Sequence, residues 1–133
     1  MNEEVLLDLK IKRIEKLLEL DDLLIEAMEK RHMDSIASLM EEKFLVINEI
    51  KDIDKRLKER RRGNFSEQNR KKFRYIKQSL SRLRKKEELL LSMAYEKLEE
   101  IKMELEQVDE AMKIKEKYKE MKKERKNIFE RVG

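Results

Sequence analysis

Residues 60–66 read Arg60-Arg61-Arg62-Gly63-Asn64-Phe65-Ser66, and this stretch decides the fold that we expect for the chain. Gly63 is the only glycine before the terminal Gly133, and the chain has no proline. Glycine suits the left-handed position that ends a helix, and Ser66 suits the N-cap of the next helix, with Asn64 as the competing cap. We therefore expect one domain over 1–133, with a first helical arm over 3–62, a turn over 63–66 and a second arm over 67–130.

The composition favours long helices over a thick globular core. Charged residues make up 48% of the chain and aromatic residues 5%. The apolar residues are nevertheless periodic, which indicates folded helices rather than a disordered chain. The absence of cysteine excludes disulfides and thiolate metal sites. Because we also find no long apolar run and no basic, apolar leader, we expect a cytoplasmic protein without a membrane segment.

Apolar residues recur at spacings of three and four along both arms, which is the pattern of a coiled-coil seam. Each arm also contains one place where two spacings of four follow each other, at Met28-His32-Ile36 and at Leu90-Ala94-Leu98. Such a stutter locally unwinds a coiled coil. The pattern predicts an all-α fold in which one stripe of each arm faces a partner helix.

Folding the chain back at Gly63 brings the two stripes into one antiparallel register. The residue numbers of facing partners then add up to 129 or 130 in every layer. The nine apolar layers are Leu57–Phe73, Ile53–Ile76, Ile50–Leu80, Val46–Leu83, Leu39–Leu90, Ile36–Ala94, Met28–Ile101, Ile25–Leu105 and Leu18–Met112. Lys43 stands opposite Glu87 in a polar layer that fixes the register. We therefore predict a long antiparallel helical hairpin turning at Gly63.

A second break is conceivable at Arg31-His32-Met33-Asp34-Ser35, where Asp34 or Ser35 is suited to cap a new helix. This stretch has neither glycine nor proline, so a continuous helix and a turn both remain open. If the chain turns near residues 31–35, the hairpin becomes a bundle of three to four helices.

Two apolar stripes are left without a partner in the hairpin. The first lies on the first arm and consists of Leu6, Leu9, Leu17, Leu20, Leu24 and Ala27. It requires a third helix, a second copy of the protein or a client. The second lies among lysines near the C-terminus, where a basic amphipathic segment is typical of partner binding and a solvated helix end is the alternative. The candidate partner-binding residues are Leu17, Leu20, Leu24, Ile114, Tyr118, Met121, Ile128 and Phe129.

Residue patterns for catalysis and cofactor binding are missing. A single internal glycine excludes a phosphate-binding glycine loop, and His32 is the only histidine. A thin helical rod also offers carboxylates no dry cavity. We expect no metal, no cofactor and no enzyme activity.

The charge is unevenly distributed along the chain. Residues 1–54 carry 8 basic and 15 acidic groups, whereas residues 55–77 carry 11 basic and 2 acidic groups. The basic corner includes Phe65, Phe73 and Tyr75, which is compatible with nucleic-acid binding, although no known reader motif is present. The arginines before Gly63 are also explained by the negative end of the helix dipole.

The segments LLELDDLLIEAM at 17–28 and HMDSIASLMEEK at 32–43 resemble the FlgN/FliT-like flagellar export chaperones. The resemblance covers about residues 5–60. It implies a cytoplasmic all-helical chaperone that binds terminal helical segments of hook–filament junction or cap subunits and delivers them to the export apparatus. It also implies that the C-terminal region engages the client, with Tyr118 as the candidate contact with the export gate. A coiled-coil scaffold that forms homo-oligomers remains the alternative function, and nucleic-acid binding a further one.

Overall fold

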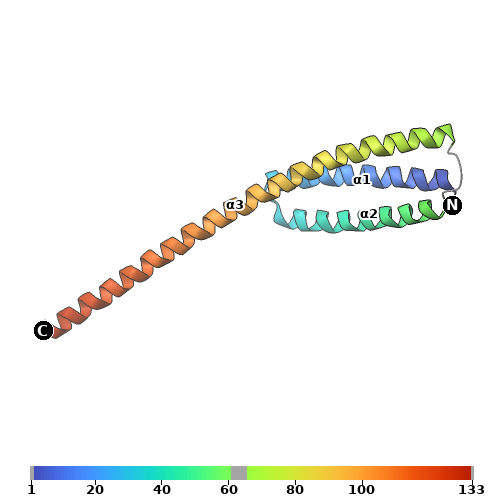
Figure 1. The fold of residues 1–133 in the computed structure, drawn as a ribbon. Coiled ribbons are helices and arrows are strands. Elements are labelled where there is room, and N and C mark those ends of the chain that lie inside the picture. The colour runs from blue at the N-terminus through green and yellow to red at the C-terminus, as the bar shows by residue number, and fades with distance from the viewer. Residues whose placement is uncertain (1, 61–65, 133) are drawn as a thin grey trace. The chain divides into compact units, whose positions relative to one another are not determined.

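The computed structural model describes residues 2–60 and 66–132, with side chains described through residue 128. These residues form three helices, α1 (Glu3–Glu29), α2 (Met33–Glu59) and α3 (Glu67–Val132), and no strand (Figure 1). The predicted all-α fold is therefore confirmed. Gly63, at which we expected the hairpin to turn, lies outside the described residues, as do Arg61, Arg62, Asn64 and Phe65.

The chain also turns between α1 and α2, so the first arm is two helices of 27 residues each. The backbone N–H of Arg31 donates to the carbonyl of Met28 at 3.3 Å, and that of His32 donates to Ala27 at 3.0 Å. This pair of bonds is the Schellman pattern that closes a helix, and it places Arg31 in the left-handed region with φ 58. Of the two alternatives for residues 31–35, the chain therefore adopts the turn, and a bundle of three helices follows.

The start of α2 differs from the prediction. The N-cap residue is His32, and its side chain makes no capping hydrogen bond. The prediction that Asp34 or Ser35 caps this helix is wrong, because α2 already begins at Met33. Asp34 instead lies in the first turn, where a carboxylate interacts favourably with the positive end of the helix dipole.

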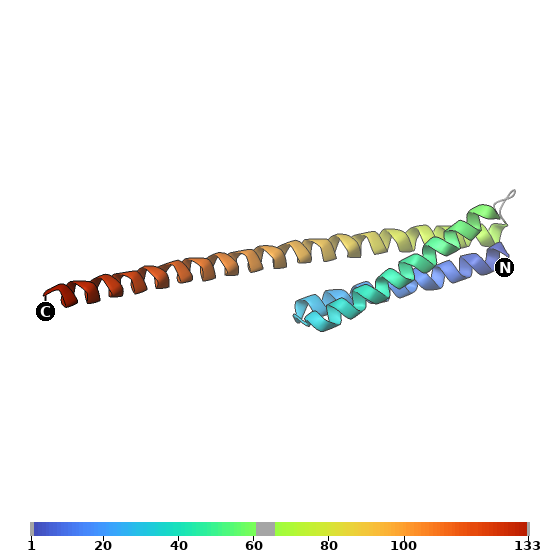
Figure 2. The same ribbon diagram turned by 90° about the horizontal axis from the view of Figure 1, so that it is seen from below.

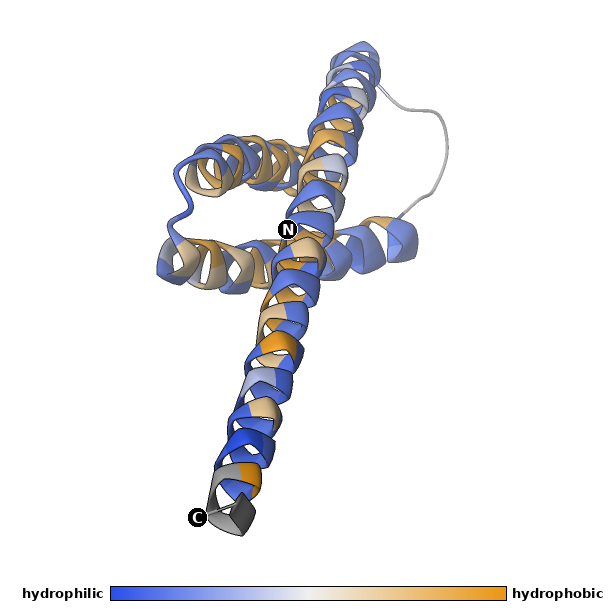
Figure 3. Cartoon of the chain, turned by 90° about the vertical axis from the view of Figure 1, so that its left-hand side faces the viewer, coloured by the Kyte–Doolittle hydropathy of each residue, from blue (hydrophilic) through white to orange (hydrophobic). Residues whose placement is uncertain are grey.

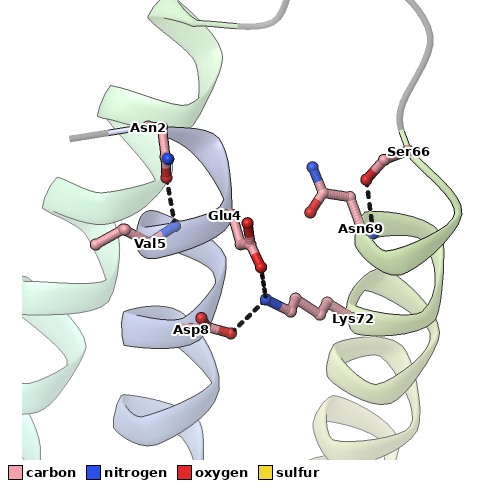
Figure 4. Close-up of polar contacts among 7 residues, drawn as sticks. All are labelled: Asn2, Glu4, Val5, Asp8, Ser66, Asn69 and Lys72. Carbon is pink, nitrogen blue, oxygen red and sulfur yellow. Dashed lines mark hydrogen bonds and ion pairs between the residues drawn. The ribbon is translucent and has the colours of Figure 1, made fainter.

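The other two helices begin with side-chain caps (Figure 4). The backbone N–H of Val5 donates to Oδ1 of Asn2 at 2.9 Å, and that of Asn69 donates to Oγ of Ser66 at 3.2 Å. Each cap satisfies one of the backbone donors that lack a partner in the first turn of a helix. Ser66 is thereby confirmed as the N-cap of the second arm.

The chain divides into two compact units, Met1–Met93 and Ala94–Gly133. In the first unit α1 and α2 lie antiparallel and side by side (Figures 1 and 2). One buried cluster joins α1 to α3 and contains Leu7, Ile14, Leu18 and Ile76. A second cluster joins α1 to α2 and contains Leu17, Leu20 and Val46. The helix α1 therefore contributes to both halves of the core.

The predicted register between α2 and α3 is confirmed in its polar layer, where Lys43 forms an ion pair with Glu87. Two apolar layers between this pair and residue 60 agree with it. Leu83 packs against the cluster that contains Val46. Leu57 and Phe73 both pack against the cluster that contains Ile76.

Four of the predicted layers need correction. Leu80 is 42% exposed, and the neighbouring Ser79 is buried instead at 2%. The reason is that α3 faces α1 as well as α2, so its buried face is turned relative to that of a two-helix hairpin. The layers built on Ile101, Leu105 and Met112 are also wrong, because these side chains are exposed. Leu18, which was assigned to Met112, packs against Ile76 because the chain turns after α1.

The second unit consists of the residues of α3 from Ala94 onward. Every described side chain from Leu98 to Ile128 is exposed. Figure 3 shows hydrophobic residues interspersed with hydrophilic ones along this part of the helix. Within this unit the described apolar side chains are therefore not buried by the chain itself.

Candidate functional site

The leucine stripe of α1 is part of the core. Leu17, Leu20 and Leu24 are 4%, 0% and 1% exposed. They are covered because the turn after α1 brings α2 against them, with Val46 in the same cluster as Leu17 and Leu20. This corrects the expectation that these three leucines are open to a partner. Of the three ways to bury the stripe, the third helix is the one that the fold uses.

The C-terminal candidate residues are on the surface. Ile114, Tyr118, Met121 and Ile128 are between 60% and 68% exposed. Their spacing places them on one face of α3, and we call them the C-terminal stripe. Nζ of Lys122 lies 5.5 Å from the centre of the Tyr118 ring, a cation–π distance within one helical turn. The side chain of Phe129, the fifth candidate, lies outside the described part of the chain.

A second exposed stripe lies just before the first. It consists of Leu98, Ile101, Leu105, Val108 and Met112, which are between 48% and 64% exposed, and we call it the central stripe. Sequence reasoning assigned these residues to the hairpin seam and therefore missed their exposure. The signal that reveals them is the break at residues 31–35, because a turn there removes α1 from the seam.

Ala111 connects the two stripes. The spacings Val108–Ala111–Ile114 are successive threes, whereas a regular heptad alternates threes and fours. Successive threes are a stammer, which overwinds a coiled coil locally and turns its apolar face. At about 100° per residue Leu105 and Ile114 lie on opposite sides of α3, so the central and C-terminal stripes occupy nearly opposite faces of this helix.

The first unit contains a buried ion cluster of Asp21, Lys43 and Glu87. Nζ of Lys43 lies 2.9 Å from Oδ1 of Asp21 and also forms an ion pair with Glu87. The side chain of Asp21 has no exposed surface, whereas that of Glu87 is 43% exposed. Within the described structure, neither oxygen of Asp21 has a hydrogen-bond partner. Lys43 therefore compensates the buried carboxylate by charge rather than by a well-directed hydrogen bond.

The pKa of Asp21 reflects this environment. Burial raises it from the usual 3.8 to about 6, the neighbouring Glu87 adds to the rise, and Lys43 opposes it. Burial by itself lowers the pKa of Lys43, but its ion pairs with Glu87 and Asp21 outweigh burial and raise the pKa above the usual 10.5. Lys43 is therefore ionised at neutral pH, next to the buried carboxyl group of Asp21.

The cluster is placed for structure rather than for substrate binding. A hollow of about 520 Å³ lies at the α1–α2 turn, but it is lined by other residues, among them Leu23, Ala27 and Leu39. In the described ranges no group of three or more His, Asp and Glu side chains is arranged to hold a metal ion. The expectation that the chain is not an enzyme stays a prediction.

Part of the basic corner is used within the fold. Nζ of Lys72 lies 3.2 Å from Glu4 and 2.8 Å from Asp8 of α1 (Figure 4). The hydroxyl of Tyr75 donates to Glu15 at 2.9 Å. Phe73 packs against the buried cluster around Ile76. Acidic side chains of α1 therefore contact Lys72 and Tyr75, and the core holds Phe73. A nucleic-acid surface would need these residues to be free.

Comparisons of the chain with protein-family models, with curated proteins and with solved structures found no match. Among the described residues, no helix has the length and apolar character needed to cross a membrane.

Proposed function

We propose that the chain is a cytoplasmic helix-binding chaperone or adaptor for protein export. In this function it binds the helical terminal segment of a client of the hook–filament junction or cap type and keeps that segment unassembled. The observation that carries the proposal is the exposed C-terminal stripe, in which Tyr118 is 60% exposed and Met121 is 65% exposed. The export role itself rests on the resemblance of residues 17–43 to the FlgN/FliT-like family.

The physical basis is the completion of an amphipathic surface. An apolar stripe with spacings of three and four binds a partner helix through its own apolar face. Ile114, Tyr118 and Met121 provide one large aromatic and two aliphatic anchors within two helical turns. Aromatic side chains are enriched among the residues that dominate binding free energy. The surrounding lysines favour an acidic client helix.

The test uses peptides that span the terminal helical segments of junction and cap subunits from the same genome. Their affinity for the full chain is measured by fluorescence anisotropy. We expect the Tyr118→Ala, Met121→Ala double variant to raise Kd at least about tenfold, which corresponds to about 1.4 kcal/mol of binding free energy. The matched control is Tyr95→Ala, which removes an aromatic side chain of similar exposure, 62%, from another face of α3.

Two results would contradict the proposal. One is that no terminal peptide binds the native chain at a peptide concentration of about 100 μM, which is the range of weak helix-in-groove contacts. The other is that the double variant and the native chain bind equally well. Circular dichroism of both variants establishes that the helices are retained.

A further inference from the structure

The central stripe of α3 has the pattern of a seam for one partner helix. Its members alternate spacings of three and four and therefore lie along one face of the helix: Leu98, Ile101, Leu105, Val108 and Met112. They are between 48% and 64% exposed. At a rise of about 1.5 Å per residue the stripe is about 21 Å long, which matches a partner helix of about four turns. Because it lies nearly opposite the C-terminal stripe, each face can bind a partner of its own.

Carboxylates border the central stripe. Within residues 98–112, helical spacing places four carboxylates and one lysine beside it: Glu100, Lys102, Glu104, Glu106 and Asp109. All five side chains are exposed. The whole segment carries six carboxylates and one lysine, which is a net charge of −5. The apolar face therefore lies in a field that attracts positive charge.

Ion pairs within α3 neutralise this border only in part. Nζ of Lys97 lies 3.9 Å from Glu100, and Nζ of Lys113 lies 3.3 Å from Asp109. With these two lysines included, residues 97–113 carry six carboxylates and three lysines, so a net charge of −3 remains. Exposed ion pairs one helical turn apart are weak, so a partner can compete for these carboxylates.

The face of the central stripe changes its charge after Met112. Helical spacing places Lys115, Lys119 and Lys123 on the same face beyond this residue. These lysines would repel a basic partner that extended further along α3. The acidic, apolar surface is therefore limited to residues 98–112.

A second copy of the chain does not suit the central stripe. The central stripe of another copy has the same acidic border, and like charges across an interface oppose binding. The C-terminal stripe of another copy is basic, but it lies nearly opposite that copy's own central stripe. A contact between these two stripes is heterologous, so any open row of copies leaves one stripe of each kind uncovered. The charges and the faces together favour a helix of another protein.

We propose that the central stripe binds a basic amphipathic helix of a partner protein. Aliphatic side chains of that helix pack on the stripe around Leu105 and Val108, and its lysines or arginines face Glu104 and Asp109. This inference does not rest on the proposed function, because it uses other residues, the opposite face and the opposite charge. If both hold, α3 carries an acidic client on one face and a basic partner helix on the other.

Fluorescence anisotropy of the full chain with two labelled model peptides tests the proposal. One peptide is a helix of about four turns with leucine at the seam positions and lysine at the flanking positions. The matched peptide has glutamate in place of every lysine. We expect the lysine peptide to bind with a Kd of about 10 μM or lower in dilute buffer and the glutamate peptide at least about tenfold more weakly. The Kd of the lysine peptide should rise with salt.

Variants of the chain assign the binding to one face. The Leu105→Ala, Val108→Ala double variant should raise the Kd of the lysine peptide at least about tenfold, because it truncates the middle of the stripe. Tyr118→Ala, Met121→Ala should change this Kd by less than about twofold, since the C-terminal stripe lies on the opposite face. The terminal peptides of junction and cap subunits should show the reverse pattern. Circular dichroism establishes that both variants keep their helices.

A second pair of variants tests the acidic border. Glu104→Gln, Glu106→Gln removes two carboxylates beside the stripe and should raise the Kd of the lysine peptide at least about threefold in dilute buffer. Glu110→Gln is the control, because helical spacing places it away from the stripe, and it should have less than half of this effect on a logarithmic scale.

Four results would overturn the proposal. The lysine peptide may fail to bind at about 100 μM, or the glutamate peptide may bind equally well. The two double variants may lose the lysine peptide to the same extent, which would assign the binding to general charge. Finally, sedimentation equilibrium may show that the native chain self-associates and that Leu105→Ala, Val108→Ala abolishes this association, which would make a second copy the occupant of the central stripe.

Discussion

The N-terminal helix and the C-terminal part of α3 carry the same kind of apolar stripe with opposite outcomes. Leu20 of α1 is fully buried, whereas Leu105 of α3 is 64% exposed. The stripe of α1 is covered because the turn at Lys30–His32 returns the same chain as α2. Residues 98–128 have no described apolar side chain covered in this way. An apolar stripe therefore indicates that a helix face needs a partner. The positions of the turns determine whether that partner is another helix of the same chain.

The largest expected effect comes from removing the buried charge of Lys43 in the first unit. Lys43→Met leaves Asp21 without its cation, and removing one member of a buried ion pair costs about 3–5 kcal/mol. We expect a loss of about 4 kcal/mol in the free energy of unfolding, measured by urea titration with circular dichroism.

Two further variants keep that result interpretable. Replacing both partners in Asp21→Leu, Lys43→Met should recover most of the loss, because an apolar pair has no unpaired charge. Lys86→Met removes the partially exposed partner of Asp22 and should cost less than about 1 kcal/mol. A Lys43→Met variant as stable as Lys86→Met contradicts the structural role of the cluster.

The next prediction compares the two stripes directly. Leu20→Ala removes a fully buried side chain and should lower the free energy of unfolding by about 3 kcal/mol. Leu105→Ala removes an exposed one and should change it by about 0.5 kcal/mol or less in dilute solution. Equal losses in urea titrations of the two variants would show that residues near Leu105 are buried by the chain itself.

A pH titration of stability tests whether the carboxyl group of Asp21 is buried in the folded chain. In the folded chain Asp21 binds a proton near pH 6, whereas the unfolded chain binds it only near the usual 3.8. The folded state thus holds the extra proton between these values, and the contribution of Asp21 to stability rises as the pH falls from 6 toward 3.8. We expect a gain of about 2 kcal/mol relative to Asp21→Asn between pH 7 and pH 4. Parallel pH dependences of the two proteins would be inconsistent with a buried Asp21.

The smallest predicted effect concerns the turn that gives α1 its partner. Arg31 occupies a left-handed position that costs a non-glycine residue about 1 kcal/mol. Arg31→Gly should raise the free energy of unfolding by about that amount, because glycine adopts this conformation without the steric cost. Lys30→Gly, at a right-handed position, should not stabilise the chain. Equal effects of the two substitutions in thermal unfolding would speak against the left-handed turn.

Several elements of the fold could be predicted because they depend on local chemistry or on complementary patterns. Ser66 caps α3 as its side chain suggests. Lys43 and Glu87 meet because opposite charges inside apolar seams fix a register. The turn after α1 could be stated only as an alternative, since its left-handed residue is Arg31 and neither glycine nor proline marks it.

The candidate site could be predicted only in part, for a different reason. Spacing identified the C-terminal stripe, but it could not distinguish the buried Leu17, Leu20 and Leu24 from a free surface. That distinction depends on a tertiary partner, here α2, which a single helix pattern does not contain. Asp21 was overlooked although a signal exists: it occupies an apolar spacing between Leu17 and Leu24. A carboxylate at such a position indicates a buried partner of opposite charge.

Hydrogen–deuterium exchange of the native chain with and without a client peptide tests the central claim most directly, namely that the C-terminal stripe is a surface completed by another molecule. Amides of α1 and α2 should be protected equally in both samples, because their partners lie in the same chain. Amides of residues 114–128 should exchange rapidly in the free chain and slow down at least tenfold when the peptide is bound. Exchange in residues 114–128 that no client peptide slows would contradict the account.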